Sequence, residues 1–117
     1  MPLPSDEKAF VTHVVDLMQT IGPVYAKGMF GGHGIFLEGL MFALIADSTL
    51  YLKCDKENEH EFTHRGLEAF SYIRQGKECK LGYFQAPEET LEDAEAMNTW
   101  ANMAYSTALR AASKKKK

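Results

Sequence analysis

Two apolar segments that meet at a single glycine constrain the fold of this chain more than any other feature. The runs HGIFLE (33–38) and LMFALIA (40–46) lie on either side of Gly39. Apolar residues recur within these runs at alternate positions, at Ile35, Leu37, Met41, Ala43 and Ile45. A period of two is typical of strands that bury one face, and glycine permits a tight turn between them. The segment therefore predicts two antiparallel strands of a half-buried sheet.

Further strand signals flank this hairpin. The run VYAKGMF (24–30) predicts the first strand, and TLYLKC (49–54) is expected to continue the third strand beyond a break at Asp47-Ser48. A second hairpin is predicted from FSYIRQ (70–75) and ECKLGYFQ (78–85), with the turn GK between them. Because hairpins dominate, we expect a mainly antiparallel sheet.

Helical spacing indicates three helices around these strands. The first follows Ser5, which can cap it, and ends before Gly22-Pro23. A short polar helix is predicted over 55–65, with Asp55 as its cap, and a long final helix follows a cap at Asp93. The apolar stripe of the final helix is expected at Met97, Trp100, Ala101, Ala104, Ala108 and Ala111.

The predicted fold is therefore a two-layer α+β domain of order α-β(3)-α-β(2)-α, with the helices on one face of the sheet. A chain of 117 residues has room for one domain, which we place at 1–113, followed by a lysine tail at 114–117. The net charge is −3, and without the four terminal lysines the rest of the chain carries −7. Such an acidic body does not suit a polyanion, so direct nucleic-acid binding is not expected. A nucleic-acid binder acting through the lysine tail remains an alternative.

The termini and the cysteines indicate a cytoplasmic protein. The first residues lack the basic and apolar regions of a signal peptide, and the longest apolar run, of seven residues, is too short to span a membrane. Cys54 and Cys79 have no metal-like spacing. We interpret them as free thiols in a reducing compartment, with a single structural disulfide as the alternative.

The glycines at Gly31, Gly32 and Gly34 raise the question of a phosphate-binding loop. No Gly-Lys-Ser/Thr follows them, and they lead into a strand rather than a helix. We interpret them as structural residues that take positive φ at a bend or bulge between strands. His33 stands among them without a serine, cysteine or carboxylate at a telling spacing, and we interpret it as an incidental packing or surface residue.

The segment HEFTH (60–64) matches the H-E-x-x-H pattern of zinc proteases. Histidines four residues apart share a helical face, and a glutamate between them can polarise zinc-bound water. Here, however, the helix is short and acidic, and Gly66 follows too early for the extended pattern. We expect no catalytic residue, metal or cofactor, and keep a zinc-dependent hydrolase using His60, Glu61 and His64 as an alternative function.

Aromatic and basic residues also alternate along the predicted strands. Tyr51, Tyr72, Tyr83, Phe84, Lys53 and Lys80 would suit a nucleic-acid-binding sheet face if they shared one. The consensus of such faces is absent, and we interpret these aromatics as core or half-buried residues.

Several local motifs together carry a family resemblance. The segments are Met29-Phe30-Gly31-Gly32, with Gly34 just after it, MFALIAD (41–47), LYLK (50–53) and the turn at Pro87-Glu88-Glu89. Through these segments, the chain resembles the N-terminal domain of the TfoX (Sxy) family of competence regulators. The resemblance extends from about Met29 to Ala112.

This resemblance implies an α/β fold similar to that of type III secretion chaperones, and no known catalytic residues. Full-length regulators of the family act on transcription of DNA-uptake genes together with the cyclic-AMP receptor protein, and carry a C-terminal domain. We therefore expect a stand-alone N-terminal module in a bacterial cytoplasm. Its expected function is non-enzymatic regulation through protein partners such as the transcription machinery, with no membrane contact. We also expect a homodimer, because a small two-layer domain often has an exposed sheet edge or face to bury.

Overall fold

Six strands form one antiparallel sheet in the computed structural model of the chain, which describes residues 7–29 and 32–115. Their order across the sheet is β1-β2-β3-β4-β6-β5, and neighbouring strands pair antiparallel throughout. The strands are β1 (Tyr25–Met29), β2 (Gly32–Leu37), β3 (Leu40–Ala46), β4 (Thr49–Lys53), β5 (Ala69–Arg74) and β6 (Lys77–Gln85). The predicted α+β class is confirmed.

Left-handed turn residues close the hairpins. Glu38 and Gly39 have φ of 50° and 81°, and Asp47 and Ser48 have φ of 51° and 55°. Two successive residues with positive φ form the tight turn that suits the twist of antiparallel strands. The turn at Asp47-Ser48 reverses the chain, so residues 49–53 form a strand of their own instead of continuing β3. Apart from this additional strand, the element order matches the prediction.

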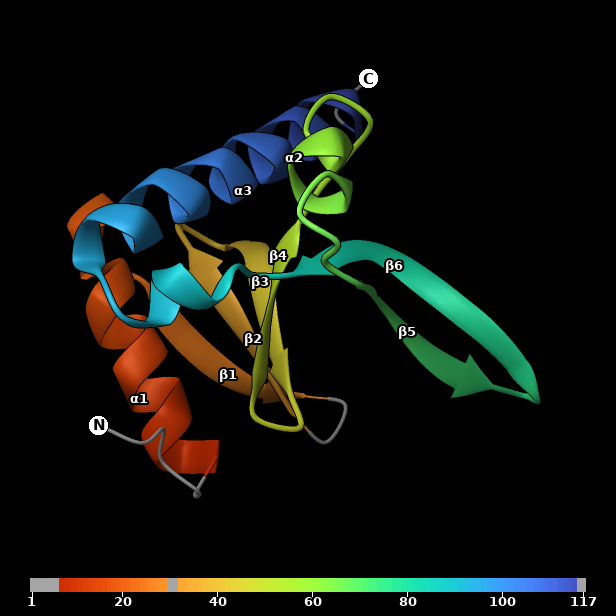
Figure 1. Cartoon of the computed structure of the whole chain (residues 1–117), viewed down its shortest axis with the longest axis horizontal. Coiled ribbons are helices and arrows are strands. Elements are labelled where there is room, and N and C mark those ends of the chain that lie inside the picture. The colour runs from red at the N-terminus through yellow and green to blue at the C-terminus, as the bar shows by residue number, and fades with distance from the viewer. Residues whose placement is uncertain (1–6, 30–31, 116–117) are drawn as a thin grey trace.

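The helices pack on one face of the sheet (Figure 1). They are α1 (Glu7–Met18), the 3₁₀ turn η1 (Gln19–Ile21), α2 (Glu59–Thr63), the 3₁₀ turn η2 (Glu88–Leu91) and α3 (Ala94–Lys115). In Figure 1, α3 runs across one end of the sheet and α1 lies along the side of β1. The core between these layers includes Phe10, Val14, Met18, Ile35, Phe42, Ile45, Leu50, Leu52, Phe62 and Met97, all at most 2% exposed.

The final helix forms as its sequence predicts. The two carboxylate oxygens of Asp93 accept hydrogen bonds from the main-chain N–H groups of Glu95 and Ala96, both at 3.3 Å, and so cap the helix. The predicted stripe is buried from Met97 to Ala108, while Ala111 is half-buried. Its alanines let α3 lie close to β3 and β4.

The short helix α2 is shorter than predicted. It spans five residues instead of residues 55–65, and Asn58, not Asp55, precedes its first turn. Asn58 turns its side chain away from the helix, because its Oδ1 accepts the main-chain N–H of Asp55 at 2.9 Å and its Nδ2 donates to Thr107 Oγ1 at 2.6 Å. The loop before α2 is thus fastened to α3. Gly66, with φ of 74°, follows the helix as expected.

A bulge changes which side chains of β3 face the helices. The register of β2 against β3 shifts between Ile35 and Phe36, so that Phe36 pairs with Met41 and Ile35 pairs with Ala43. The extra residue, Phe42, is fully buried in the core. The predicted alternation of Met41 with Ala43 is therefore wrong: Met41 lies on the face away from the helices.

No helix in the described part of the chain is long and apolar enough to cross a membrane.

Candidate interaction surface on the open face of the sheet

The face of the sheet away from α1 and α3 is covered by aromatic and methionine side chains. Leu44 lies between the core residues Ala43 and Ile45 in β3, so its side chain points to the opposite side of the strand. It is only 4% exposed there. Leu44 pairs with Gly34 of β2 and with Tyr51 of β4. Because directly paired residues point to the same side of a sheet, these positions belong to the same face as Leu44. This outer face consists of Tyr25, Met29, Phe36, Met41, Leu44, Tyr51, Phe70 and Tyr83, with Lys27 and Lys53.

One half of the outer face is built around Phe36. The ring of Tyr25 stacks on it with centroids 5.6 Å apart and 12° between the planes. The ammonium group of Lys27 lies 5.6 Å from the same ring centre. Tyr25 is nevertheless 42% exposed. This end of the sheet, which is also its β1 edge, therefore presents a large aromatic side chain to the surroundings.

Gly34 allows this cluster to form. A Cβ atom at Gly34 would lie 2.9 Å from Met29 Sδ, 3.0 Å from Phe36 Cε1 and 3.1 Å from Met41 Sδ. The two methionines and the phenylalanine therefore close over the glycine backbone. Methionine thioethers are flexible and polarizable, and surfaces rich in them adapt to the shape of a binding partner.

The other half of the outer face contains three rings at the centre of the sheet. Tyr51 and Phe70 meet edge to face with centroids 5.0 Å apart, and the ammonium group of Lys53 lies 5.0 Å from the ring centre of Tyr83. Burial raises the pKa of Tyr83 to about 12. Of the aromatic and basic residues weighed from the sequence, Tyr51, Tyr83 and Lys53 share this face. Phe84 instead packs on Phe62 in the core, and the side chains of Tyr72 and Lys80 lie outside the described part.

The glycine motif has a structural role, but not the role that we predicted. Gly32 and Gly34 keep ordinary strand conformations, while positive φ occurs at other glycines such as Gly39 and Gly82. A Cβ atom at Gly32 would overlap the carbonyl oxygen of Ile45, so a close approach of two strands requires glycine there. Phe30 and Gly31 lie outside the described residues.

His33 has a partner that its sequence neighbours do not reveal. Its Nδ1 lies 3.3 Å from Glu7 Oε2, a carboxylate that begins α1. The other oxygen of Glu7 accepts the main-chain N–H of Ser48 at 3.0 Å. Glu7 thus joins the start of α1 to the start of β2 and to the β3–β4 turn. His33 therefore lies against the carboxylate of Glu7, although its Nδ1 is buried and makes no hydrogen bond within the described part of the chain.

The residues of the H-E-x-x-H pattern lie on the surface. His64 directly follows α2, and the His60 side chain, 72% exposed, has its Nε2 3.3 Å from Glu61 Oε2. Among the described residues, no group of three His, Cys, Asp or Glu side chains is placed to hold a metal ion. The geometry therefore brings no third ligand from the described part of the fold to His60 and His64.

Pro87 shapes the turn that follows the sheet. Its carbonyl oxygen accepts the Thr90 hydroxyl at 2.6 Å and the Thr90 main-chain N–H at 3.0 Å, which closes η2. Thr90 itself is fully buried. The proline–acid motif therefore fixes the chain reversal between β6 and α3.

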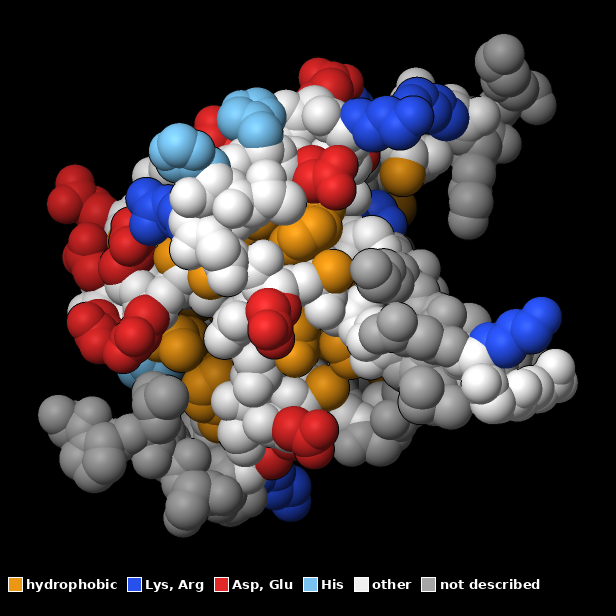
Figure 2. Space-filling model, turned by 45° about the vertical axis from the view of Figure 1, so that its right-hand side comes forward, with side chains coloured by type: hydrophobic (Ala, Val, Ile, Leu, Met, Phe, Trp, Pro, Cys, Tyr) orange, Lys and Arg blue, Asp and Glu red, His pale blue; other side chains and the backbone are white. Residues whose placement is uncertain are grey.

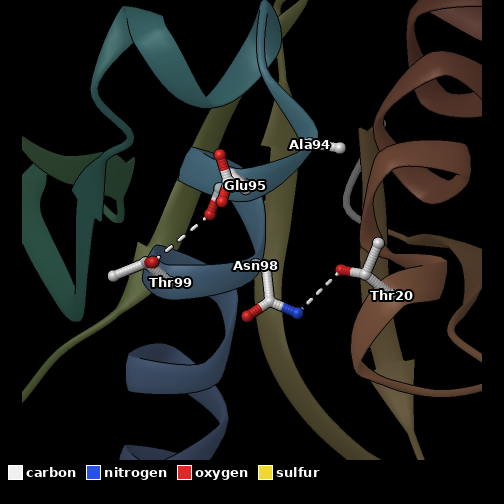
Figure 3. A pocket seen from close by; sticks show the side chains of 5 residues that line it. All are labelled: Thr20, Ala94, Glu95, Asn98 and Thr99. Atoms are coloured by element: carbon white, nitrogen blue, oxygen red, sulfur yellow. Dashed lines mark hydrogen bonds between the residues drawn. The ribbon is translucent and has the colours of Figure 1, made fainter.

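A shallow pocket of about 300 Å³ lies between η1 and the start of α3 (Figure 3). Its polar groups are already paired: Asn98 Nδ2 donates to Thr20 Oγ1 at 3.0 Å, and Thr99 Oγ1 donates to the Glu95 carbonyl at 3.2 Å. The residues that line it are Thr20, Ala94, Glu95, Asn98 and Thr99. These contacts join η1 to α3, and they do not resemble a catalytic constellation.

A comparison with protein families identifies the domain. Residues 16–108 match the TfoX N-terminal domain. The chain belongs to the TfoX N-terminal domain family. The matched range contains all six described strands, so the outer face lies within the TfoX N-terminal domain. The resemblance drawn from the motifs is confirmed.

One curated relative of this chain is a DNA transformation protein. The DNA transformation protein TfoX1 of Aliivibrio fischeri (strain ATCC 700601 / ES114) is 30% identical over 73 residues, which is 62% of this chain. The chain spans 35% of the length of that relative.

Proposed function

We propose that this chain is a non-enzymatic module that regulates DNA transformation by binding a protein through the outer face of its sheet. The observation that carries the proposal is the set of aromatic and methionine side chains on a face to which the described helices do not pack. Apolar side chains gathered on an exposed surface mark protein interaction sites, and aromatic residues and methionine are enriched in them.

The family supports the biological setting of this proposal. The relative named above is a DNA transformation protein, and this chain has a TfoX N-terminal domain. From this relation we infer that the chain regulates the uptake of DNA and that the protein it binds is a component of the transcription machinery. The adaptability of Met29 and Met41 suits such a surface.

The two most exposed large apolar side chains provide a matched test. Tyr25, 42% exposed, lies on the outer face, and Leu109, 48% exposed, lies on α3. In a strain that lacks the gene, we expect the wild-type chain and Leu109→Asp to restore transformation frequency and the transcripts of DNA-uptake genes. Tyr25→Asp should fail to do so although it folds.

Two results would contradict the proposal in different ways. If loss of the gene leaves transformation and these transcripts unchanged, the regulatory role is wrong. If Tyr25→Asp restores both as well as Leu109→Asp, the outer face is not the surface that acts.

A further inference from the structure

A groove of about 340 Å³ lies at one end of the sheet, between the β3–β4 turn, the last residues of β6 and η2. Its wall is apolar where these elements meet, because Leu50 and Ala86 are buried there and Leu67 and Leu91 are half-buried. This volume is at the small end for a binding site. The groove therefore has room for side chains of a partner, but not for a whole helix or strand. The other residues that line it are Ser48, Thr49, Gln85 and Glu88.

The main chain beside the groove is already hydrogen-bonded. The N–H of Ala86 donates to the Leu50 carbonyl oxygen at 2.9 Å, and the N–H of Gln85 donates to the Glu68 carbonyl oxygen at 2.8 Å. These bonds join the end of β6 to β4 and to the residue before β5. A segment that enters the groove is therefore held by its side chains, and not by pairing with the sheet.

The β5–β6 hairpin points away from the groove. β6 has nine residues, but it pairs with β4 only through Tyr83, Phe84 and Gln85. At Gly82, with φ of 79°, β6 departs from β4, and the Gly82 carbonyl oxygen accepts the main-chain N–H of Cys54 at 2.8 Å. Beyond this point, the described register partners of β6 are all in β5, and the hairpin projects from the body (Figure 1). The groove lies at the opposite end of β6, beside Gln85.

Negative charge borders the groove. The three segments that form it, 47–50, 67–68 and 85–92, contain five acidic residues and no basic one. Of the ion pairs between described side chains, one involves this border, where Arg65 binds Glu89 at 2.8 Å. The border therefore stays acidic overall. Its five acidic residues, all exposed, are Asp47, Glu68, Glu88, Glu89 and Glu92.

The acidic border adjoins the Tyr51 end of the outer face. Gln85 pairs with Tyr51, so the two side chains point to the same side of the sheet. Burial raises the pKa of Tyr51, and the negative charges of Asp47 and Glu68 raise it further, which places both carboxylates near this ring. Figure 2 shows hydrophobic side chains in the middle of one side of the molecule, acidic side chains gathered on the left and the tip of the β5–β6 hairpin at the far right.

We propose that this groove binds a segment of a partner protein in which an aliphatic residue is next to a lysine or an arginine. The aliphatic side chain occupies the groove against Leu67 and Leu91, and the basic side chain lies over Asp47, Glu68 and Glu88. Burial of the aliphatic side chain favours binding, and the opposite charges speed association and fix the orientation of the segment.

The charge of the border decides which partner fits. A nucleic acid, an anionic membrane or an acidic peptide would place like charges against the border, whereas a basic segment is attracted to it. The site is additional to the surface around Tyr25 and Phe36 and does not depend on the function proposed for that surface.

Binding of short fluorescent peptides to the full chain tests the proposal. The probe is Lys-Leu-Lys-Leu-Lys, which offers both kinds of side chain. Lys-Ser-Lys-Ser-Lys keeps only its charge, and Glu-Leu-Glu-Leu-Glu keeps only its leucines. We expect the probe to bind, and to dissociate as salt is raised because exposed charges are screened. Both control peptides should bind far more weakly.

Charge reversal separates the border from the acidity of the whole chain. Glu68→Lys/Glu88→Lys should raise the dissociation constant of the probe roughly tenfold or more, since it places like charges against each other. Glu59→Lys/Glu61→Lys is the matched control. It changes the net charge equally, but it lies in α2, which supplies none of the lining residues named above. Circular dichroism verifies that each variant is folded.

Amide chemical shifts locate the bound probe on the wild-type chain. We expect the probe to shift the signals of residues 48–50, 67–68 and 85–91, and to leave those of residues 25–29 unchanged. Tyr25→Asp should bind the probe as the wild type does. A failure of this site is thereby distinguished from a failure of the proposed function.

Four outcomes would overturn the proposal. If the probe does not bind, or binds no better than the serine peptide, the groove does not accept an aliphatic side chain. If both charge-reversed pairs weaken binding equally, overall acidity is responsible. Probe-induced shifts confined to another surface would place the site there. A wild-type mass of twice 13.1 kDa, with concentration-dependent shifts at these same residues, would assign the groove to a second copy of the chain.

Discussion

Arg110 and Asp55 form a two-point ion pair between α3 and the loop that follows β4. Arg110 Nε donates to Asp55 Oδ2 at 2.9 Å, and a second guanidinium N–H donates to Asp55 Oδ1 at 3.1 Å. Both side chains are about one-third exposed. The same guanidinium group also reaches Thr107 Oγ1 at 3.2 Å. The ion pair thus lies beside the buried Asn58–Thr107 hydrogen bond and protects one side of it from water.

Removal of this ion pair should destabilise the domain more at neutral pH than in strong acid. The hydrogen bond from Arg110 is the main cause that lowers the pKa of Asp55 below its ordinary value of 3.8. A lowered carboxyl pKa adds stability above the unfolded-state pKa, and that stability is lost as the pH falls through the folded-state value.

We therefore expect Arg110→Ala to lower the free energy of unfolding by about 1 kcal/mol or less at pH 7, and by a smaller amount near pH 2. Urea titrations at both values measure this difference. Lys114→Ala, one turn further along α3 and exposed, serves as the control. An Arg110→Ala effect of equal size at both values would show that lost packing dominates.

The buried hydrogen bond itself should matter more. Thr107→Val keeps the shape of the side chain but leaves Asn58 Nδ2, 2.6 Å from the present hydroxyl, without its acceptor. An unsatisfied buried donor costs about 1–3 kcal/mol, which thermal or chemical unfolding will detect. Thr99→Val is a close control, because its hydroxyl makes the same bond to a carbonyl four residues earlier but is exposed. Its effect should stay within about 0.5 kcal/mol.

The glycines of the family motif can be separated by the space around them. A Cβ atom at Gly32 meets the carbonyl oxygen of Ile45. At Gly28 of the neighbouring strand β1, which pairs with His33, a Cβ atom would come no closer than 4.0 Å to the Gly32 carbonyl oxygen. Gly32→Ala should lower the free energy of unfolding by about 1–3 kcal/mol, as overpacking does. Gly28→Ala should be neutral or slightly stabilising, because it restricts the unfolded chain. Similar losses in both variants would contradict the close contact.

The thiol of Cys54 should be unreactive while the domain is folded. Burial is the main cause that raises its pKa to about 11 from 9.0, and the carboxylates of Glu59 and Asp55 add to it. At pH 8 the thiolate that attacks alkylating reagents is therefore scarce. In a Cys79→Ser background, we expect labelling to be slow in buffer and fast in denaturant. Rapid labelling of the folded protein would show that the thiol is accessible and ionised.

The raised pKa of Cys54 also determines how the stability of the domain changes in alkali. A group with a raised folded-state pKa contributes its stability fully below the unfolded-state pKa and loses it as the pH rises through the folded-state value. Cys54 therefore makes the domain less stable from about pH 9 to pH 11. Tyr83, whose folded-state pKa is about 12, continues the loss above pH 10. Cys54→Ala should have a weaker decline between pH 9 and 10 than the wild type.

The metal hypothesis is decided by analysis of the purified, untagged chain. With no third ligand placed near His60 and His64 by the described residues, we expect far less than one zinc per chain. The substitution His64→Ala should leave metal content unchanged. One equivalent of zinc that disappears in this variant would instead favour the hydrolase alternative.

Local patterns predicted the local features of this fold well. The turn at Gly39, the cap at Asp93 and the stripe on α3 depend on residues a few positions apart, and the structure agrees with each of them. The bulge after Ile35 was not predicted, because a strict period of two places Met41 on the same face as Ala43, and the extra residue Phe42 is evident only from the pairing with β2. The Glu7–His33 contact joins residues 26 positions apart, which no spacing rule reveals.

The outer face illustrates the remaining difficulty. Alternation separates two sets of side chains in β1 to β4, but it does not say which set the helices cover when both sets are apolar. Phe36, Met41 and Tyr51 therefore read as ordinary half-buried residues in the sequence. They are recognised as a candidate binding surface only because the structure places α1 and α3 on the other side of the sheet.

The point at Gly82 where β6 departs from β4 has a further consequence for variation among relatives. The core depends on residues 83–85 of β6 and hardly on the strand before them, so the reach of the hairpin is set independently of the body. An insertion of one residue pair across the tip would extend it by about 3 Å, and two pairs would keep every side chain on its original face. Length changes in this one hairpin thus offer a way to alter partner choice while the folded domain stays intact.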